Sequence, residues 1–252
     1  MKAKYYAALM AAAFTLLVIS VPVQASKTDA RIESSARKSY IFKTYLKDDD
    51  IKIQSKDGAV TLTGLVSEES HKALAKETVV GLLRVKSLDN RLEIKGAPPT
   101  ANSDAWLKDK VKFVLMFHRS VISANTEVDV KDGIVILRGI ATSQAQKELT
   151  AEYARDVDGV KDVKNEMTLL KAGDKTLQTS GEKVDDTSIT VQVKMALLLH
   201  QSTSALQITV KTKRGVVTLG GKAKNTAEKN QVAKLVSDIH GVKSVDNRMT
   251  IK

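Results

Sequence analysis

The chain contains no cysteine among its 252 residues. It can therefore form no disulfide, thiolate metal site, lipidated cysteine or cysteine nucleophile. Small exported domains of eukaryotes usually carry disulfides, so an exported chain without cysteine is more typical of the bacterial envelope. The sequence also has no His-x-x-x-His pair and no serine-elbow motif. Its motifs therefore provide neither a zinc protease site nor a serine hydrolase site.

Long apolar runs are also missing, apart from one at the N-terminus. Two lysines open the chain, and an apolar stretch from Ala7 to Val21 is followed by small residues that end at Ala25. The stretch is short for a membrane span, and the pattern is typical of a cleaved secretory signal. We therefore predict a signal peptide at residues 1–25 with cleavage near Ala25, and a mature protein in the periplasm. An uncleaved membrane anchor is the alternative.

One pattern occurs three times in the rest of the chain. Each copy has two glycines on either side of a short apolar strand, and an asparagine 32 residues after the first glycine. Such a constant spacing indicates one small module used repeatedly. We divide the chain into repeat 1 (28–97), repeat 2 (103–171), a linker (172–184) and repeat 3 (185–252). The motif residues are Gly58, Gly64 and Asn90 in repeat 1, Gly133, Gly139 and Asn165 in repeat 2, and Gly215, Gly221 and Asn247 in repeat 3.

Each repeat predicts the element order α-β-β-α-β. Apolar residues near 3.6-residue spacing predict the first helix, which we expect to begin with Asp104 as N-cap in repeat 2. A tight turn at the first glycine joins two alternating strands, and a second helix precedes a last alternating strand. The fold class is therefore α+β, with three small modules in tandem. Each module is expected to have a three-stranded mixed sheet with two helices on one face.

The residues that the repeats share have a structural and a functional interpretation. The paired glycines could cradle a phosphate, but they span a strand instead of opening a helix. We therefore interpret the first of each pair as a turn residue, and Gly64, Gly139 and Gly221 as the ends of strands. The asparagines are expected to satisfy backbone groups of loops, with a ligand role as the alternative. His118 and His200 end the first helix of their repeats, where the helix macrodipole favours a cation.

Net charge distinguishes the repeats. Repeat 3 contains 11 Lys and Arg against 5 Asp and Glu, whereas repeat 2 contains 11 of each. Export argues against nucleic acid as a partner, so anionic lipid or polyanionic polymers of the envelope are the candidate partners of a basic chain. For the basic edge of repeat 3 we expect an anionic head-group site, with a merely solvated face as the alternative. We expect this edge to comprise Lys211, Lys213, Arg214, Lys222 and Lys224.

Repeat 2 has a different distinguishing feature. Ile134 and Ile136 occupy positions where repeat 1 has Ala59 and Thr61. If they lie on the open face of the sheet, an apolar face there indicates contact with another repeat or a protein partner. If the register is one residue different, they belong to the ordinary core.

The paired glycines and the Val-x-x-Val/Leu-x-Asn segments that end at Asn90, Asn165 and Asn247 resemble the BON-domain family, in particular its OsmY-like periplasmic type. The resemblance covers nearly the whole mature chain in three copies, whereas relatives of that type often have two. It implies the αββαβ fold, a non-enzymatic role without cofactors, contact with phospholipid and protection of the envelope under osmotic or other stress. We expect a monomer that binds anionic phospholipid surfaces or envelope proteins. The alternative is a chaperone-like or scaffolding partner of envelope proteins without lipid binding.

Overall fold

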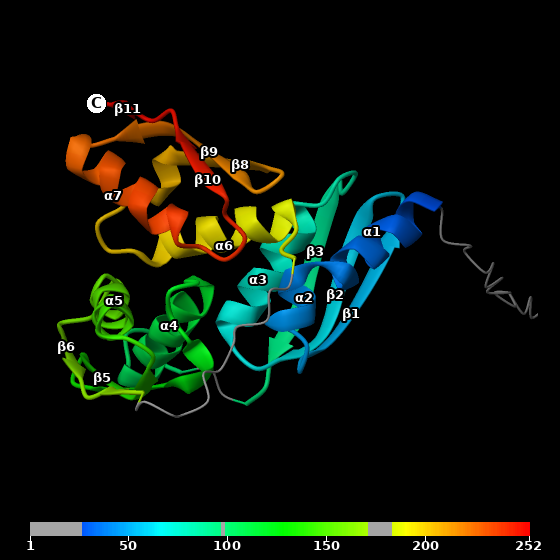
Figure 1. The fold of residues 1–252 in the computed structure, drawn as a ribbon. Coiled ribbons are helices and arrows are strands. Elements are labelled where there is room, and N and C mark those ends of the chain that lie inside the picture. Colours follow the sequence, from blue (N-terminus) through cyan, green and yellow to red (C-terminus); the bar gives the residue numbers. More distant parts are fainter. Residues whose placement is uncertain (1–26, 97–98, 171–182) are drawn as a thin grey trace, which may run out of the picture.

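The computed structural model describes residues 27–96, 99–170 and 183–252. The predicted signal peptide and most of the predicted linker lie outside these ranges. Within them, three units built on the same α-β-β-α-β plan pack with their helices towards the middle and their sheets outwards (Figure 1). None of the helices in these three ranges is both long and apolar enough for a membrane span.

Repeat 1 differs from the prediction in its first helix, which is broken into two. Ser39 interrupts it and becomes the N-cap of the second piece, where its hydroxyl accepts a hydrogen bond from the backbone nitrogen of Phe42. The elements of repeat 1 are α1 (Lys27–Lys38), α2 (Tyr40–Thr44), β1 (Asp50–Lys56), β2 (Ala59–Val66), α3 (Glu69–Val80) and β3 (Ser87–Ile94).

Repeats 2 and 3 each have one unbroken first helix. The prediction that Asp104 caps it is wrong, because the hydroxyl of Ser103 accepts the hydrogen bond from the nitrogen of Trp106 at 3.2 Å. Repeat 2 consists of α4 (Asp104–Phe117), η1 (Ser123–Asn125), β4 (Thr126–Lys131), β5 (Ile134–Ala141), α5 (Gln144–Arg155), β6 (Asp162–Asn165) and β7 (Thr168–Leu169). Repeat 3 consists of α6 (Asp186–Leu199), η2 (Ala205–Gln207), β8 (Ile208–Lys213), β9 (Val216–Ala223), α7 (Thr226–Ser237), β10 (Ser244–Asn247) and β11 (Thr250–Ile251).

The three sheets have the same topology. The middle strand pairs antiparallel with the strand before it and parallel with the strand that follows the second helix. β7 and β11 continue β6 and β10 along the same middle strand, so each sheet is three strands wide. Alternate residues of the middle strand, such as Val60 and Leu62, are fully buried, and their side chains point towards the helices. The predicted α+β fold of three mixed-sheet modules is confirmed.

The second glycine of each repeat lies inside the middle strand, so the prediction that it ends the strand is wrong. Gly139 pairs with Thr126 of β4 and has a φ of 116°. A Cβ at this position would lie 1.9 Å from the carbonyl oxygen of Asn125. Gly64 and Gly221 have the same environment. The glycine is required because the neighbouring backbone occupies the place of a side chain.

An aspartate from the first helix holds each hairpin turn, a contact that the sequence prediction missed. Asp104 accepts hydrogen bonds from the backbone nitrogens of Asp132 and Gly133, at 2.7 and 2.9 Å. Asp29 and Asp186 make the same two contacts in their repeats. All three aspartates precede the turn glycine by 29 residues, so the constant spacing contained the signal. The bonds satisfy turn N–H groups that the sheet leaves unpaired.

The repeated asparagines join the last strand to the second helix. The Nδ2 of Asn165 donates to the carbonyl oxygen of Lys147 in α5 at 2.7 Å, and its Oδ1 accepts from the nitrogen of Met167 at 3.2 Å. Asn90 and Asn247 make the corresponding pairs of contacts. These contacts are structural, and one acceptor is a helix carbonyl instead of the loop group that was expected.

Candidate functional site

A row of exposed basic side chains follows the open face of the repeat 3 sheet. Lys211 and Lys213 alternate along β8 with Val210, which is only 8% exposed. Since successive strand residues point to opposite faces, both lysines lie on the open side. The turn after β8 adds one arginine, and the far end of β9 adds two lysines, all exposed. We name these five residues the basic strip: Lys211, Lys213, Arg214, Lys222 and Lys224.

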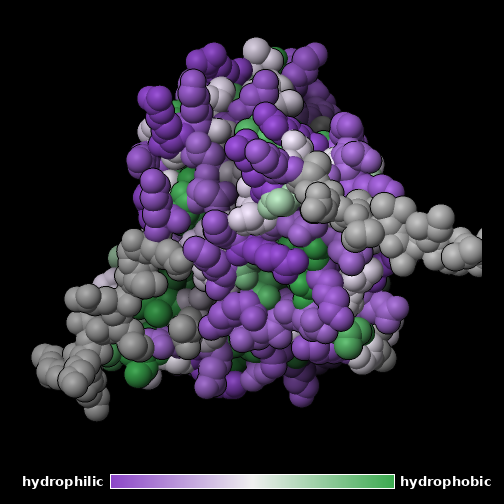
Figure 2. All heavy atoms as spheres, turned by 90° about the vertical axis from the view of Figure 1, so that its right-hand side faces the viewer, coloured by the Kyte–Doolittle hydropathy of each residue, from purple (hydrophilic) through white to green (hydrophobic). Residues whose placement is uncertain are grey.

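None of the five bases of the basic strip forms an ion pair in the described ranges. The acid of β10, Asp246, is paired with Arg248 at 2.7 Å. The residues of repeat 2 that correspond to Lys211 and Arg214 are both acidic, Asp129 and an aspartate in the turn. Asp129 is itself paired with Lys108. The surface over repeat 3, at the top of Figure 2, is predominantly hydrophilic. Repeat 3 therefore presents bases on its open face at positions where repeat 2 carries acids.

The open face of the repeat 2 sheet carries an apolar row. Ile134 and Ile136 alternate along β5 with Val135 and Leu137, which are fully buried on the helix side. The two isoleucines therefore lie on the open face, and the alternative of a register shifted by one residue is excluded. Both are half-buried, and Ile140 continues the row at 43% exposure.

Repeats 2 and 3 contact each other through equivalent segments. Backbone hydrogen bonds run from the nitrogen of Asp158 to the oxygen of Leu199 (3.0 Å), and from the nitrogen of His240 to the oxygen of Phe117 (2.9 Å). The two donors are 82 residues apart in the sequence, and so are the two acceptors. Each repeat thus uses the same surface, as in a self-complementary interface. A second reciprocal pair, both bonds at 2.9 Å, runs from Arg119 N to Asp238 O and from Gln201 N to Asp156 O.

Repeat 1 is attached through a different surface. The backbone nitrogen of Tyr40 donates to the Asp185 carboxylate at 2.8 Å, and that of Ile41 to the hydroxyl of Ser188 at 3.3 Å. The hydroxyl of Tyr45 donates to Gln192 of α6 at 3.1 Å. Repeat 1 therefore packs on α6, which lies in the middle of the molecule (Figure 1).

His118 and His200 lie in the interface between repeats 2 and 3. His118 is completely buried, its Nδ1 is 3.5 Å from Oδ2 of Asp238, and its ring stacks on Tyr153 with centroids 3.7 Å apart. Burial lowers the pKa of His118, although Asp238 and Asp156 oppose the change. The helix-dipole interpretation is therefore wrong for His118, because the neutral imidazole is favoured. His200 occupies the equivalent place, 3.4 Å from Asp156.

Asp238 has more polar contacts than its counterpart across this interface. Its carboxylate accepts hydrogen bonds from the hydroxyls of Ser120 and Tyr153 and lies 3.4 Å from Nε of Arg119. Burial is the largest influence and would raise the pKa of Asp238, but the contacts from His118, Ser120 and Tyr153 together lower it to about 2. The carboxylate is therefore charged at any physiological pH.

Comparison with known proteins explains the threefold pattern. The family model of the BON domain matches residues 28–96, 103–171 and 185–252, which make up most of the chain. This chain belongs to the BON-domain family. The three matched segments coincide with the three units of Figure 1, so each BON domain is one αββαβ module.

Two relatives share the BON sequence pattern. The "Osmotically-inducible protein Y" of Escherichia coli (strain K12) is 29% identical over 149 residues, which are 59% of this chain and 73% of that protein. The "Uncharacterized protein in gshII 5'region" of Anaplasma centrale is 29% identical over 137 residues, 54% of this chain and 87% of that protein. This BON chain is therefore similar to the OsmY type, as its glycine and asparagine pattern indicated.

A solved structure gives a weaker likeness. It is CdsD, a structural protein of the Type III secretion system of Chlamydia trachomatis, with 16% identity and a TM-score of 0.25 over 84% of this chain and 90% of that chain. Similarity at that level carries no argument about how the three BON domains are arranged.

The first BON domain contains an Asp–His contact of the kind found in catalytic dyads. The Nδ1 of His71 lies 2.6 Å from Oδ2 of Asp49, whose side chain is only 1% exposed. However, the hydroxyl of Ser67 donates to the same carboxylate at 2.7 Å and not to the imidazole, so no nucleophile–base pair is formed. Across residues 27–96, 99–170 and 183–252, no group of His, Asp and Glu side chains is arranged to hold a metal ion.

The interface between the second and third BON domains is expected to weaken in acid. Because the pKa of His118 is lowered in the folded chain, the unfolded chain takes up the proton first. The free energy of unfolding therefore falls as pH drops below about 6.5. For the one proton that His118 takes up on unfolding, the decrease is at most about 1.4 kcal/mol for each pH unit. The stability from the lowered pKa of Asp238 is present above about pH 4 and lost only below it.

NMR titration of the histidine rings and urea unfolding between pH 7.5 and 5 measure this effect. The His118 ring should titrate below 6.5, and His118→Asn should flatten the pH dependence of the unfolding free energy. Burial also lowers the pKa of His240, so some slope should remain in that variant. A His118 midpoint at or above 6.5 contradicts the prediction.

Proposed function

We propose that this BON-domain protein is a non-enzymatic periplasmic protein that binds anionic phospholipid surfaces and supports the envelope under osmotic or other stress. The observation that carries the proposal is the basic strip, five exposed bases without ion pairs in the described residues. Each base close to an anionic membrane contributes on the order of 1 kcal/mol. The secretory pattern at residues 1–25 supports the periplasmic location, and the name of the inducible relative supports a role in stress.

The shape of repeat 3 fits a flat anionic surface. Its helices cover one face of the sheet, and the opposite face carries Lys211, Lys213 and Lys222 at positions that point the same way. A membrane could meet these amines together without any change in the fold. Since screening by salt weakens contacts between exposed charges, the binding should be strongest at low ionic strength.

Reversing two charges of the basic strip is expected to remove most of the binding. For Lys211→Glu with Lys213→Glu, the loss of about 2 kcal/mol corresponds to roughly thirtyfold weaker binding, and the new acids add repulsion. Flotation with vesicles of phosphatidylglycerol and phosphatidylethanolamine, at low and high salt, measures the change.

A matched control is available in repeat 1. Lys52 and Lys56 are exposed on β1, and their reversal to glutamate changes the net charge by the same amount. The control variant should float nearly as well as the unchanged protein. Equal losses in the two variants would mean that net charge alone is responsible, and undiminished flotation of the repeat 3 variant would refute the proposal.

The apolar row on the open face of repeat 2 favours a second candidate function. A chaperone-like or scaffolding protein would bind envelope proteins through Ile134 and Ile136 and would need no lipid. Crosslinking in periplasm combined with vesicle flotation separates the candidates. Protein crosslinks without flotation support the scaffold, and flotation without specific crosslinks supports the lipid-binding protein.

A further inference from the structure

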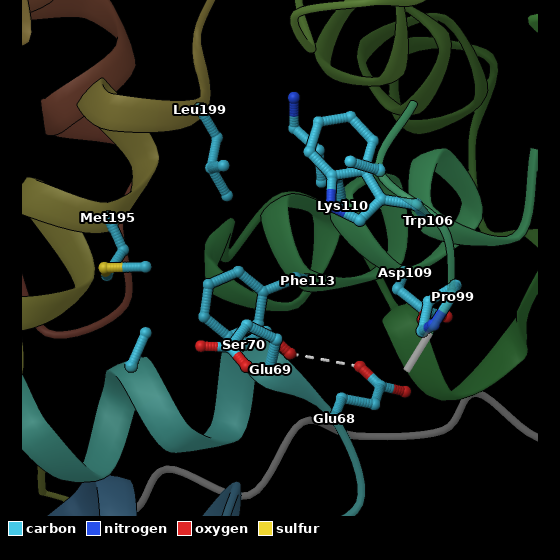
Figure 3. Close-up of a pocket in the computed structure, with 12 residues that line it drawn as sticks. Glu68, Glu69, Ser70, Pro99, Trp106, Asp109, Lys110, Phe113, Met195 and Leu199 are labelled. Carbon is cyan, nitrogen blue, oxygen red and sulfur yellow. Dashed lines mark hydrogen bonds between the residues drawn. The ribbon is translucent and has the colours of Figure 1, made fainter. Parts of the chain in front are cut away.

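A cavity of about 270 Å³ lies where the three BON domains meet (Figure 3). Its walls come from α3, α4 and α6, one helix of each domain, and from Pro99 and Ala101 in the segment between repeats 1 and 2. The lining is mostly apolar and includes two aromatic rings and a thioether. The apolar lining side chains include Ala73, Trp106, Phe113, Met195 and Leu199.

Three carboxylates border this cavity. Glu68 and Glu69 lie at the start of α3, and Asp109 lies on α4 (Figure 3). In the part of the chain that the structure describes, none of the three forms an ion pair. Glu68 accepts a hydrogen bond from the hydroxyl of Ser70 at 3.1 Å, which leaves its charge uncompensated.

The one base in the lining is already engaged elsewhere. The Nζ of Lys110 donates to the carbonyl oxygen of Asp158 at 2.7 Å and lies 4.2 Å from the ring centroid of Trp106. It therefore neutralises little of the charge at the rim.

The electrostatics of Asp109 agree with this shortage of positive charge. Burial and then the nearby charge of Glu68 raise the pKa of Asp109, although Lys112, Lys108 and His71 act in the opposite direction. Two carboxylates held near each other in a partly apolar site favour an added cation, because a positive charge relieves their mutual repulsion.

We propose that this cavity binds a small amphiphilic cation, with its apolar part against Trp106, Phe113 and Met195 and its ammonium group at the carboxylate rim. Aromatic and carboxylate side chains are the groups that recognise organic ammonium ions. The volume is close to the lower limit of about 300 Å³ for small-molecule sites, so a whole phospholipid is too large. The rim also repels anionic ligands, which separates this site chemically from the basic strip.

The chain offers a direct reporter for the test. Trp106 is its single tryptophan, so fluorescence excited selectively at tryptophan reports on the cavity wall. Octyltrimethylammonium, octanol and octyl sulfate share one chain length and differ in charge, and each can be titrated below its micelle concentration. The cation should give a saturable fluorescence change at a concentration about tenfold or more below the other two, equivalent to about 1.4 kcal/mol.

Two variants identify the origin of that preference. Glu68→Gln with Asp109→Asn should weaken the cation about tenfold while leaving octanol unchanged. Asp48→Asn with Glu93→Gln removes the same charge from exposed positions outside the cavity and should change neither ligand. Saturation by octyl sulfate as tight as by the cation overturns the proposal, even without any variant. So does an equal loss of cation affinity in both variants.

Discussion

Replacing Gly139 by alanine is expected to unfold repeat 2, with a loss on the order of 4 kcal/mol in the free energy of unfolding. The new Cβ would lie 1.9 Å from the carbonyl oxygen of Asn125, far closer than a carbon and an oxygen atom can approach without bonding. That oxygen belongs to the residue before β4, whose ladder with β5 fixes its position. Relief therefore requires the strands to separate, which breaks hydrogen bonds on both sides. Urea unfolding followed by circular dichroism measures the loss.

Gly96→Ala is the matched control for this substitution. Gly96 has a φ of 80°, but a Cβ there would meet nothing within 4 Å. The control should lose only the conformational cost of a left-handed residue, about 1–2 kcal/mol. The difference between the two variants in the free energy of unfolding gives the cost of the clash with the neighbouring strand. Similar losses in both would show that the clash at Gly139 is relieved and that the explanation is wrong.

Asp238→Ala is expected to separate the third BON domain from the second, at a cost of about 3 kcal/mol. The change removes the acceptor of two hydroxyl hydrogen bonds, from Ser120 and Tyr153, and the acid beside His118. These groups would stay at the interface without a partner, which costs more than the bonds themselves contributed. We expect urea unfolding to change from one transition to two, since cooperativity between domains depends on their interface.

The self-complementary interface supplies the control. Asp156 is the counterpart of Asp238, 82 residues earlier in the sequence, and both are the C-caps of their helices. Its side chain is 27% exposed and its ionic contact is with His200 at 3.4 Å. Asp156→Ala should therefore cost about 1 kcal/mol or less. If both variants lose the same free energy of unfolding, the hydroxyl contacts of Asp238 contribute nothing to the stability of the interface.

The module fold could be predicted from the sequence because its signals are local. Turn glycines, alternating strands and a constant interval from Gly133 to Asn165 describe one unit regardless of its neighbours. The role of Gly139 was predicted wrongly because its signal is also local. The repetition of the glycine in three copies shows that a glycine is needed there, but not which atom lies close to it. The aspartate of the first helix, Asp104, was overlooked although its interval to the turn is constant.

The arrangement of the domains left almost no signal in the sequence. The contacts of Asp158 and His240 across the interface are made by backbone groups, which every residue possesses. His118 and His200 were visible as equivalent residues, but only the structure shows that each faces an aspartate of the other domain. Phe113 and Met195 in the cavity wall are equivalent residues, 82 positions apart, but the wall also includes residues of α3, the second helix of its repeat, so periodicity alone could not reveal it.

The pairing of repeats 2 and 3 limits how a protein of this kind can grow by duplication. A contact in which both partners present the same surface is closed, because each surface is used once and none is left over. A stacked solenoid, by contrast, offers a new surface after every added unit. A fourth copy appended to this chain would find the pairing surfaces of repeats 2 and 3 already occupied. It would have to attach through another surface, as repeat 1 does on α6.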